Sequence, residues 1–174
     1  GSADIILIPE IPYDINLVAD KIRERDQRGK QFTIIVVSEG AKEIGGDVVV
    51  NKIVGDSPDP IRLGGVANKI ALQLEEILGN EHEVRHVVLG HTQRGGETSP
   101  SDRILSCRYG SAAARLIHEE KYGNMVCVRG GVIGHVPLED VIGQNKFVQP
   151  DCELVQVARD LGVSFGDKKV TRRK

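Results

Sequence analysis

One short stretch, Gly90 to Gly96 (GHTQRGG), gathers the residue types best suited to binding a phosphorylated small molecule. Arg94 carries a planar guanidinium that can hold a phosphate or a carboxylate through two parallel hydrogen bonds. His91, three residues earlier, can hydrogen-bond a phosphate or a sugar hydroxyl. Gly95 and Gly96 have no Cβ, so the backbone there can approach a ligand closely. A lone loop histidine or arginine is more often simply solvated, so the case for function depends on the combination.

The elements on either side of this stretch would place it at a ligand-binding edge. An apolar run, Val84 to Leu89, precedes it and is typical of a buried strand. A helix follows, capped by Ser99 or Ser101, with Pro100 and Asp102 in its first turn. Ligands in open α/β sheets bind at the carboxyl ends of strands, and a helix N-terminus adds free N–H groups that favour anions. The sequence therefore predicts a strand, a binding loop and a helix in succession.

Two further residues are candidates for the same site. Glu10 follows Pro9 at the end of another apolar run, where a carboxylate can accept hydrogen bonds from sugar hydroxyls; a helix cap or a salt bridge is an equal alternative. Arg85 lies at the start of the strand that His91 follows, and six extended residues separate the two by roughly 20 Å. One phosphate cannot easily touch both in one chain. Arg85 is therefore either a rim residue in a local salt bridge or a ligand for a neighbouring subunit's site.

Short apolar runs alternate with amphipathic segments along the whole chain. Strands are expected at 4–8, 32–37, 84–89 and 125–128, and helices at 15–28, 65–78, 101–122 and 151–161. Residues 40–63 are the least regular and are interpreted as a surface loop, with a possible short edge strand at 48–50. The order predicts one α/β domain spanning residues 1–174, a three-layer sandwich in which helices flank a mainly parallel sheet of about four strands.

Composition narrows the possible partners. The formal net charge is −2, and aromatic residues make up 3% of the chain with no tryptophan, so we expect no nucleic-acid partner. No apolar run approaches the roughly 20 residues of a membrane span, and no membrane partner is expected. The three cysteines show no metal-ligand spacing, which indicates reduced thiols and a cytoplasmic location. No P-loop, dinucleotide fingerprint or metal motif is found, so the sequence presents only half of a phosphoryl-transfer site.

The motif LGHTQRGG at residues 89–96, followed by SPSDR, resembles the phosphofructokinase family, whose LGHxQRGG motif is highly specific. Residues 8–10, Ile-Pro-Glu, resemble the family's PE motif, and Arg85 is the matching arginine ahead of the loop. Residues 59–74 are similar to the longer-loop branch of the family. The resemblance runs in order over nearly the whole chain.

The resemblance implies an enzyme that phosphorylates fructose 6-phosphate to fructose 1,6-bisphosphate in glycolysis. Its donor would be ATP or pyrophosphate with magnesium, and the enzyme would be an allosteric homo-oligomer, either a dimer or a tetramer. In that picture Glu10 binds sugar hydroxyls, while His91 and Arg94 hold the sugar phosphate or the reacting end. Arg85 reaches the sugar phosphate bound by a neighbouring subunit.

The chain departs from the family in one large respect. The Gly-rich donor segments (GGDxPG-like, and GGDG or GGDD) and the TxDxD segment with the catalytic aspartate are missing. We therefore expect residues 1–174 to be the C-terminal sugar-phosphate-binding lobe, with the N-terminal donor lobe absent. Such a fragment would contain no catalytic residue, bind no magnesium or ATP and be inactive alone. The alternatives are a non-catalytic sugar-phosphate-binding module and a regulatory lobe whose site has decayed.

Overall fold

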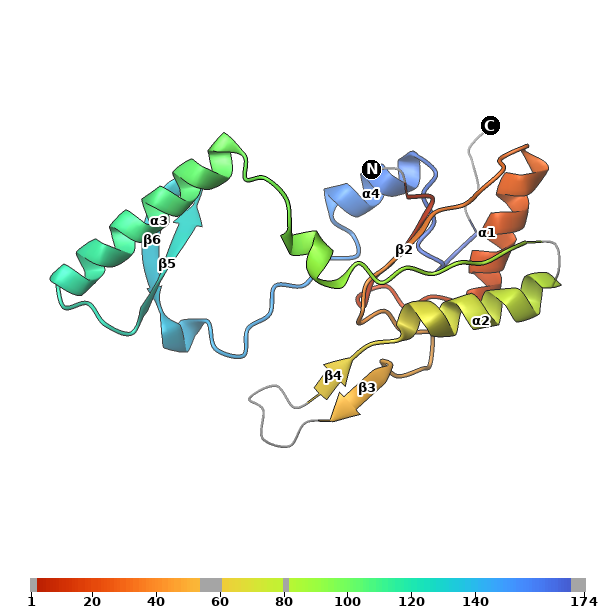
Figure 1. Cartoon of the computed structure of the whole chain (residues 1–174), viewed down its shortest axis with the longest axis horizontal. Helices are drawn as coiled ribbons and strands as arrows, with labels where there is room; N and C mark the ends of the chain where they lie inside the picture. The colour runs from red at the N-terminus through yellow and green to blue at the C-terminus, as the bar shows by residue number, and fades with distance from the viewer. Residues whose placement is uncertain (1–2, 54–60, 80–81, 170–174) are drawn as a thin grey trace. The chain divides into compact units, whose positions relative to one another are not determined.

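The computed structural model describes residues 3–53, 61–79 and 82–169, which form two compact units of mixed α/β structure (Figure 1). Unit 1 consists of residues 1–88 and 147–174, and unit 2 of residues 89–146. The helices are α1 (Ile15–Gln27), α2 (Val66–Leu78), α3 (Pro100–His118) and α4 (Glu153–Asp160). The strands are β1 (Ile5–Leu7), β2 (Ile35–Val37), β3 (Val50–Ile53), β4 (Ile61–Leu63), β5 (Asn124–Arg129) and β6 (Val132–Pro137).

Helix α1 follows directly from its sequence signals. The carboxylate of Asp14 accepts a hydrogen bond from the amide of Asn16 at 2.8 Å, which satisfies one of the free N–H groups at the start of the helix. Beyond the last turn the chain passes through Gly29 at φ +74°, a left-handed conformation that glycine adopts without strain. The predicted helix at 15–28, its cap and its end are therefore confirmed. Its buried apolar side chains are Ile15, Val18, Ala19 and Ile22.

The core of unit 1 forms between the parallel pair β1–β2 and the helices α1 and α2. Residues Ile5 and Leu7 of β1 align with Ile35 and Val37 of β2. Both β1 side chains are fully buried, in one cluster with the apolar faces of α1 and α2. Because parallel strands run in the same direction, the chain leaves both strands at the same edge of the sheet. The loops that follow β1 and β2 therefore share this edge.

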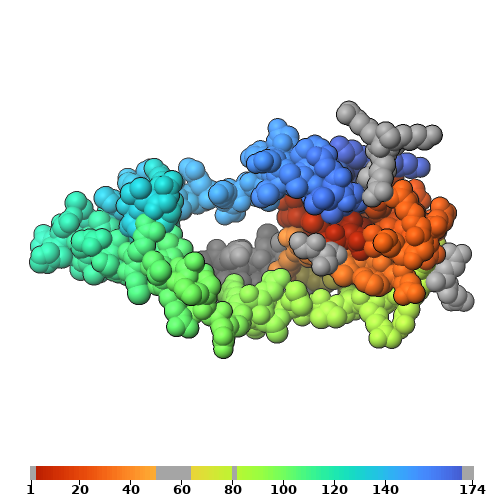
Figure 2. Space-filling model, turned by 90° about the horizontal axis from the view of Figure 1, so that it is seen from above, coloured from red at the N-terminus to blue at the C-terminus, as the bar shows by residue number. Residues whose placement is uncertain are grey.

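The C-terminal segment of the chain returns to the first strand. The amide of Ile6 donates to the carbonyl of Ser164 at 2.9 Å, and the amide of Ser164 donates to the carbonyl of Asp4 at 3.0 Å. The first and last segments of unit 1 consequently lie side by side, in red and blue in the space-filling view (Figure 2). Helix α4 belongs to this returning segment, and Val155 on α4 packs with Ile11 and Phe165 in a second buried cluster.

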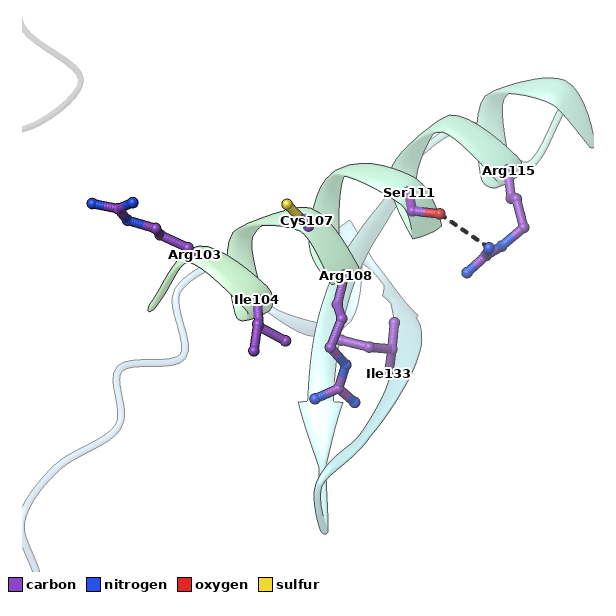
Figure 3. A pocket seen from close by; sticks show the side chains of 7 residues that line it. All are labelled: Arg103, Ile104, Cys107, Arg108, Ser111, Arg115 and Ile133. Atoms are coloured by element: carbon purple, nitrogen blue, oxygen red, sulfur yellow. Dashed lines mark hydrogen bonds between the residues drawn. The ribbon is translucent and has the colours of Figure 1, made fainter. Parts of the chain in front are cut away.

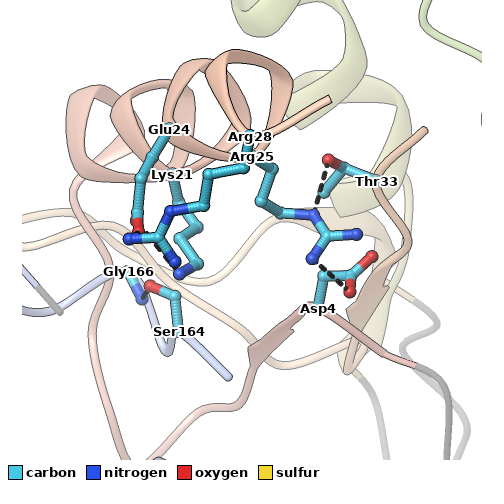
Figure 4. A network of polar contacts seen from close by, with 8 residues as sticks. All are labelled: Asp4, Lys21, Glu24, Arg25, Arg28, Thr33, Ser164 and Gly166. Atoms are coloured by element: carbon cyan, nitrogen blue, oxygen red, sulfur yellow. Dashed lines mark hydrogen bonds and ion pairs between the residues drawn. The ribbon is translucent and has the colours of Figure 1, made fainter. Parts of the chain in front are cut away.

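A polar network fixes the C-terminal part of α1 to the starts of both strands (Figure 4). Arg25 forms an ion pair with Asp4 at 2.8 Å and donates its Nε hydrogen to the hydroxyl of Thr33 at 3.1 Å. The other oxygen of Asp4 accepts from the amide of Ile34 at 2.9 Å. Arg25 and Asp4 are largely buried, so solvent screens this pair less than an exposed one.

Unit 2 consists of α3 packed on the β5–β6 hairpin. Ser99 is the N-cap of α3: its hydroxyl accepts from the amide of Asp102, while the Asp102 carboxylate accepts from the Ser99 amide, a reciprocal capping box. Strands β5 and β6 are antiparallel and turn at Gly130 and Gly131, both with positive φ. The helix predicted at 101–122 is confirmed as α3, which ends at His118, and the strand predicted at 125–128 is confirmed as part of β5; β6 pairs back onto it.

The prediction of a strand at residues 84–89 is wrong. Val84 packs against the core of unit 1, but Val87 and Val88 are 77% and 75% exposed, and no described strand pairs with them. A continuous apolar run forms a stable strand only where both of its faces are covered. Each sheet among the described residues therefore has two strands, and β1–β2 is the parallel pair. These pairs are not joined into the expected sheet of about four strands.

The irregular region at 40–63 contains more structure than a surface loop. Strands β3 and β4 form an antiparallel pair in it, and the short edge strand expected at 48–50 lies slightly later in the chain, as β3. Residues 54–60 of this region lie outside the described residues.

Tyr13 provides a test of how well the core of unit 1 excludes water. Its side chain is 1% exposed, and burial, together with the nearby Glu43 carboxylate, raises the pKa of the Tyr13 phenol to about 12. The neutral phenol is favoured in the fold, so its contribution to stability is complete below pH 10 and is lost as the pH rises towards 12. Ultraviolet titration of tyrosinate should show one of the three tyrosines ionising late, and Tyr13→Phe should remove that phase. Ionisation of all three near pH 10 would contradict the buried placement.

Candidate binding site at the loop Gly90–Gly96

The loop predicted to bind a phosphorylated ligand adopts a short 3₁₀ helix, Gly90–Arg94. Backbone hydrogen bonds hold it: the amide of Thr92 donates to the carbonyl of Leu89, and the amide of Gly95 donates to the carbonyl of Thr92, both at 3.1 Å. Gly96 has φ +110°, and a Cβ built on it would meet no atom within 4 Å. The backbone at Gly96 is therefore open to an approaching ligand, as its glycine suggested.

The two basic residues of the loop are accessible. His91 and Arg94 are exposed, and neither side chain forms a hydrogen bond or ion pair with another described residue. An arginine that is not engaged by a carboxylate of its own chain retains all five N–H donors for an anion. This loop therefore presents an unoccupied guanidinium and an imidazole on one short helical turn.

Hydrogen bonds at the start of α3 hold the residues that follow the loop. Arg103 donates its Nε hydrogen to the hydroxyl of Thr98 at 3.0 Å. Hydrogen bonds from the Ser99 hydroxyl and amide lower the pKa of the Asp102 carboxyl, which keeps it ionised in its capping role. The Asp–Arg pair after the loop thus has a structural function: it orders residues 98–103 so that the loop enters α3 in one conformation.

Glu10 follows β1, as predicted, and its carboxylate is partly used by the chain itself. One oxygen, Oε1, accepts a hydrogen bond from the amide of Val148 at 3.0 Å. The other, Oε2, is buried and has no partner among the described residues. A buried carboxylate oxygen without a donor needs an explanation, and a hydroxyl group of a ligand would supply one.

A second carboxylate, Glu39, follows β2 and was not singled out from the sequence. Because β1 and β2 are parallel neighbours, Glu39 lies after the same edge of the sheet as Glu10. Its side chain is exposed. The signal that could have identified it was the same as for Glu10: a polar Ser-Glu-Gly sequence directly after a buried apolar run.

Arg85 forms the local salt bridge that was one of its two interpretations. Its Nε donates to Oε1 of Glu83 at 2.8 Å, and its side chain is 80% exposed. Exposed pairs of this kind contribute little free energy, so the bridge would not hold the arginine strongly against a competing phosphate. Arg85, Glu10 and Glu39 belong to unit 1, whereas His91 and Arg94 belong to unit 2.

No group of three or more His, Cys, Asp or Glu side chains in the described ranges is arranged to hold a metal ion. In those same ranges, no helix has the length and apolar character needed to cross a membrane.

The fold and the loop together define an α/β protein with a candidate anion-binding turn, and comparison with known proteins identifies its family. The phosphofructokinase family model matches residues 1–117 of the 174. The chain belongs to the phosphofructokinase family. The expectation drawn from the LGHTQRGG motif is therefore confirmed.

Curated relatives share most of this chain. ATP-dependent 6-phosphofructokinase 2 of Clostridium perfringens is 59% identical over 167 residues, which are 96% of this chain and 45% of that protein. ATP-dependent 6-phosphofructokinase of Chloroflexus aurantiacus is 48% identical over 168 residues, 97% of this chain and again 45% of that protein. The chain thus spans less than half the length of these relatives.

Solved structures confirm the fold. A pyrophosphate-dependent phosphofructokinase from Marinobacter aquaeolei superposes with a TM-score of 0.63 at 23% identity, covering 86% of this chain and 35% of that one. Phosphofructokinase from Saccharomyces cerevisiae superposes with a TM-score of 0.60 at 23% identity, covering 79% of this chain and 17% of that one. The α/β fold is that of part of a phosphofructokinase.

Proposed function

We propose that residues 1–174 are the fructose 6-phosphate-binding part of an ATP-dependent 6-phosphofructokinase. The observation that carries this proposal is the accessible His91 and Arg94 on a GHTQRGG turn, in a chain that is 59% identical to a protein named ATP-dependent 6-phosphofructokinase. In the full-length enzyme the acceptor hydroxyl of the sugar attacks the terminal phosphorus of ATP. A new O–P bond forms, the bond to the ADP oxygen breaks, and the hydroxyl proton passes to a base outside this chain.

The loop would act on the acceptor sugar. Arg94 pairs with the sugar phosphate through its guanidinium fork, and His91 hydrogen-bonds the same phosphate or the sugar. Arg85 contributes to the sugar phosphate of a neighbouring subunit, which requires a homo-oligomer. These contacts hold the acceptor hydroxyl in line for attack, and such positioning is a major source of rate enhancement in phosphoryl transfer.

The donor side would lie elsewhere in the protein. ATP is favoured over pyrophosphate because the relatives at 59% and 48% identity are named ATP-dependent, whereas the pyrophosphate-dependent neighbour is only 23% identical. ATP and magnesium would be held mainly by an N-terminal donor lobe outside residues 1–174, so this chain alone would bind the sugar phosphate without transferring phosphate. A cytoplasmic location, where glycolytic sugar phosphates occur, belongs to the same proposal.

The proposal is tested by assaying the full-length protein for ADP formation from ATP. Turnover should require fructose 6-phosphate and magnesium, and the product should be fructose 1,6-bisphosphate. The 174-residue chain, assayed in parallel, should show no turnover. Full-length protein that binds fructose 6-phosphate but never phosphorylates it would instead indicate the non-catalytic module.

A paired substitution decides which carboxylate binds the sugar. Glu10→Gln and Glu39→Gln each keep the shape of the side chain while removing its charge. The variant that removes a hydrogen bond to the sugar hydroxyls should raise the KM for fructose 6-phosphate by about 10- to 100-fold, since a hydrogen bond to a charged group contributes about 1.5–3 kcal/mol. The residue that only supports the backbone should instead change the thermal stability. An unchanged KM in both variants would remove both carboxylates from the site.

A further inference from the structure

The segment that follows β2 carries Glu39 on a β-turn whose ends are both anchored. The amide of Ala41 donates to the carbonyl of Ser38 at 2.9 Å, which closes a turn with Glu39 at its second position. The amide of Ser38 donates to the carbonyl of Leu7 at the end of β1, also at 2.9 Å, and Ala41 is fully buried. Glu39 itself is exposed, so a well-held turn presents an accessible carboxylate at this edge of the sheet.

Two residues beyond this turn, the carboxylate of Glu43 ties the segment to helix α2. Its Oε2 accepts from the ammonium of Lys69 at 3.2 Å and from the side-chain amide of Gln73 at 3.3 Å. Lys69 and Gln73 lie one turn apart on α2, a helix that is fixed in the core by Ile70 and Leu74. The amide oxygen of Gln73 is buried and has no partner among the described residues, so in that part of the chain only Glu43 engages this amide.

The backbone of Tyr13 holds the same segment. Its amide donates to the carbonyl of Lys42 at 3.0 Å, and its carbonyl accepts from the amide of Ile44 at 2.8 Å, so that Tyr13 and Glu43 form a parallel bridge. Burial, and then the nearby Glu43 carboxylate, raise the pKa of the Tyr13 phenol to about 12. Residues 42–44 are therefore held twice, by backbone hydrogen bonds to Tyr13 and by side-chain bonds from α2.

We propose that Glu43 is a positioning residue for the sugar site, which fixes the turn at residues 38–41 so that Glu39 meets the sugar hydroxyls in one orientation. The inference rests on the proposed function, and within it on Glu39 as a carboxylate that binds the sugar. A carboxylate on a loose turn loses conformational freedom when it binds, and this loss weakens binding. The contacts of Glu43 with α2 restrict the turn in advance, so less freedom is lost when the sugar arrives.

A double-mutant cycle in the full-length protein tests this role, with kcat/KM for fructose 6-phosphate as the measured quantity. Glu43→Ala should lower kcat/KM by about 3- to 10-fold, through KM and with kcat nearly unchanged, which is the size of coupling expected between residues of one network. In a Glu39→Ala background the same substitution should have no further effect, because no carboxylate remains to be positioned. Glu43→Gln should recover most of the loss, since its amide oxygen still accepts from Lys69 and Gln73.

Glu24 on α1 provides a matched control for a purely structural effect (Figure 4). The side chains of Glu24 and Glu43 are 29% and 27% exposed, and each accepts from a lysine, Glu24 from Lys21 at 3.0 Å. Glu24→Ala leaves the buried Lys21 without this partner, so it should lower the thermal stability. Its effect on kcat/KM should be equally small with and without the Glu39 carboxylate.

Amide hydrogen exchange in the full-length protein reports on the turn without any substrate. Glu43→Ala should speed exchange at the amides of Ala41 and Ile44 at least about fivefold, because their hydrogen bonds then open more often. Helix α3 (Figure 3) is the internal reference and should exchange at its wild-type rate, since it belongs to unit 2.

Three results would overturn this proposal. The first is an equal effect of Glu43→Ala with and without the Glu39 carboxylate, which would leave Glu43 a structural role only. The second is wild-type kinetics in Glu39→Ala, and the third is wild-type exchange at the Ala41 and Ile44 amides in Glu43→Ala. Wild-type protein that does not turn over fructose 6-phosphate would instead contradict the proposed function, and the exchange rates would still test whether Glu43 holds the turn.

Discussion

Arg94→Ala in the full-length protein is expected to raise the KM for fructose 6-phosphate by about 10- to 100-fold. The guanidinium is exposed and has no ion-pair partner among the described residues, so removing it should cost binding without disturbing the fold. The size of the effect follows from losing charge-assisted hydrogen bonds to a phosphate, which contribute about 1.5–3 kcal/mol. Steady-state kinetics with fructose 6-phosphate varied at saturating ATP measure it.

Three further variants serve as comparisons for Arg94→Ala. Arg94→Lys keeps the charge but loses the two-pronged geometry, so its KM should fall between those of the wild type and Arg94→Ala. His91→Ala should raise the KM in the same direction. Lys121→Ala, which removes an exposed ion pair with Glu119 elsewhere in unit 2, should leave the KM unchanged. Wild-type kinetics in both Arg94→Ala and His91→Ala would contradict the assignment of the loop.

Gly166→Ala is expected to destabilise unit 1 by about 2–5 kcal/mol. Gly166 has φ +70°, and a Cβ there would lie 2.9 Å from Cβ of Tyr13 and 3.0 Å from Cγ2 of Val18. Both neighbours are fully buried, so neither can move without disturbing the core. The left-handed conformation costs about 1–2 kcal/mol and overpacking about 1–3 kcal/mol more. Urea unfolding of the 174-residue chain, followed by circular dichroism, measures the change.

Gly29→Ala is the matched control for this substitution. Gly29 has φ +74°, but a Cβ on it would meet no atom within 4 Å. It should therefore lose only about 1–2 kcal/mol, from the backbone conformation alone. If the two variants are destabilised equally, the tight packing around Gly166 is not present in solution.

The helices could be predicted well because their signals are local. The Asp14 and Ser99 caps and the apolar spacing that follows them fix where α1 and α3 begin, and each lies within a few residues of the feature it determines. The segment at 84–89 could not be predicted in the same way. Its apolar composition is equally compatible with a covered strand and with an uncovered extended segment, and which one forms depends on surfaces distant in sequence.

The candidate site residues also divide into those with local sequence signals and those that depend on distant contacts. His91 and Arg94 could be identified because loop, glycines and basic residues are adjacent in the sequence. The choice between Glu10 and Glu39 could not be made, because it depends on the Val148 amide, 138 residues from Glu10, which engages one carboxylate oxygen. Arg85 likewise forms a bridge with its neighbour Glu83, and a contact with another subunit would leave no local trace in the sequence.

The central claim is that the loop Gly90–Gly96 binds the phosphate of the acceptor sugar. The most direct test compares kcat/KM for fructose 6-phosphate with kcat/KM for fructose, which lacks the phosphate, in the wild-type full-length enzyme and in Arg94→Ala. The preference for the phosphorylated sugar should fall by about 10- to 100-fold in the variant, because only the phosphorylated substrate loses a contact. An equal decrease in kcat/KM for both sugars, with the preference unchanged, would contradict the claim.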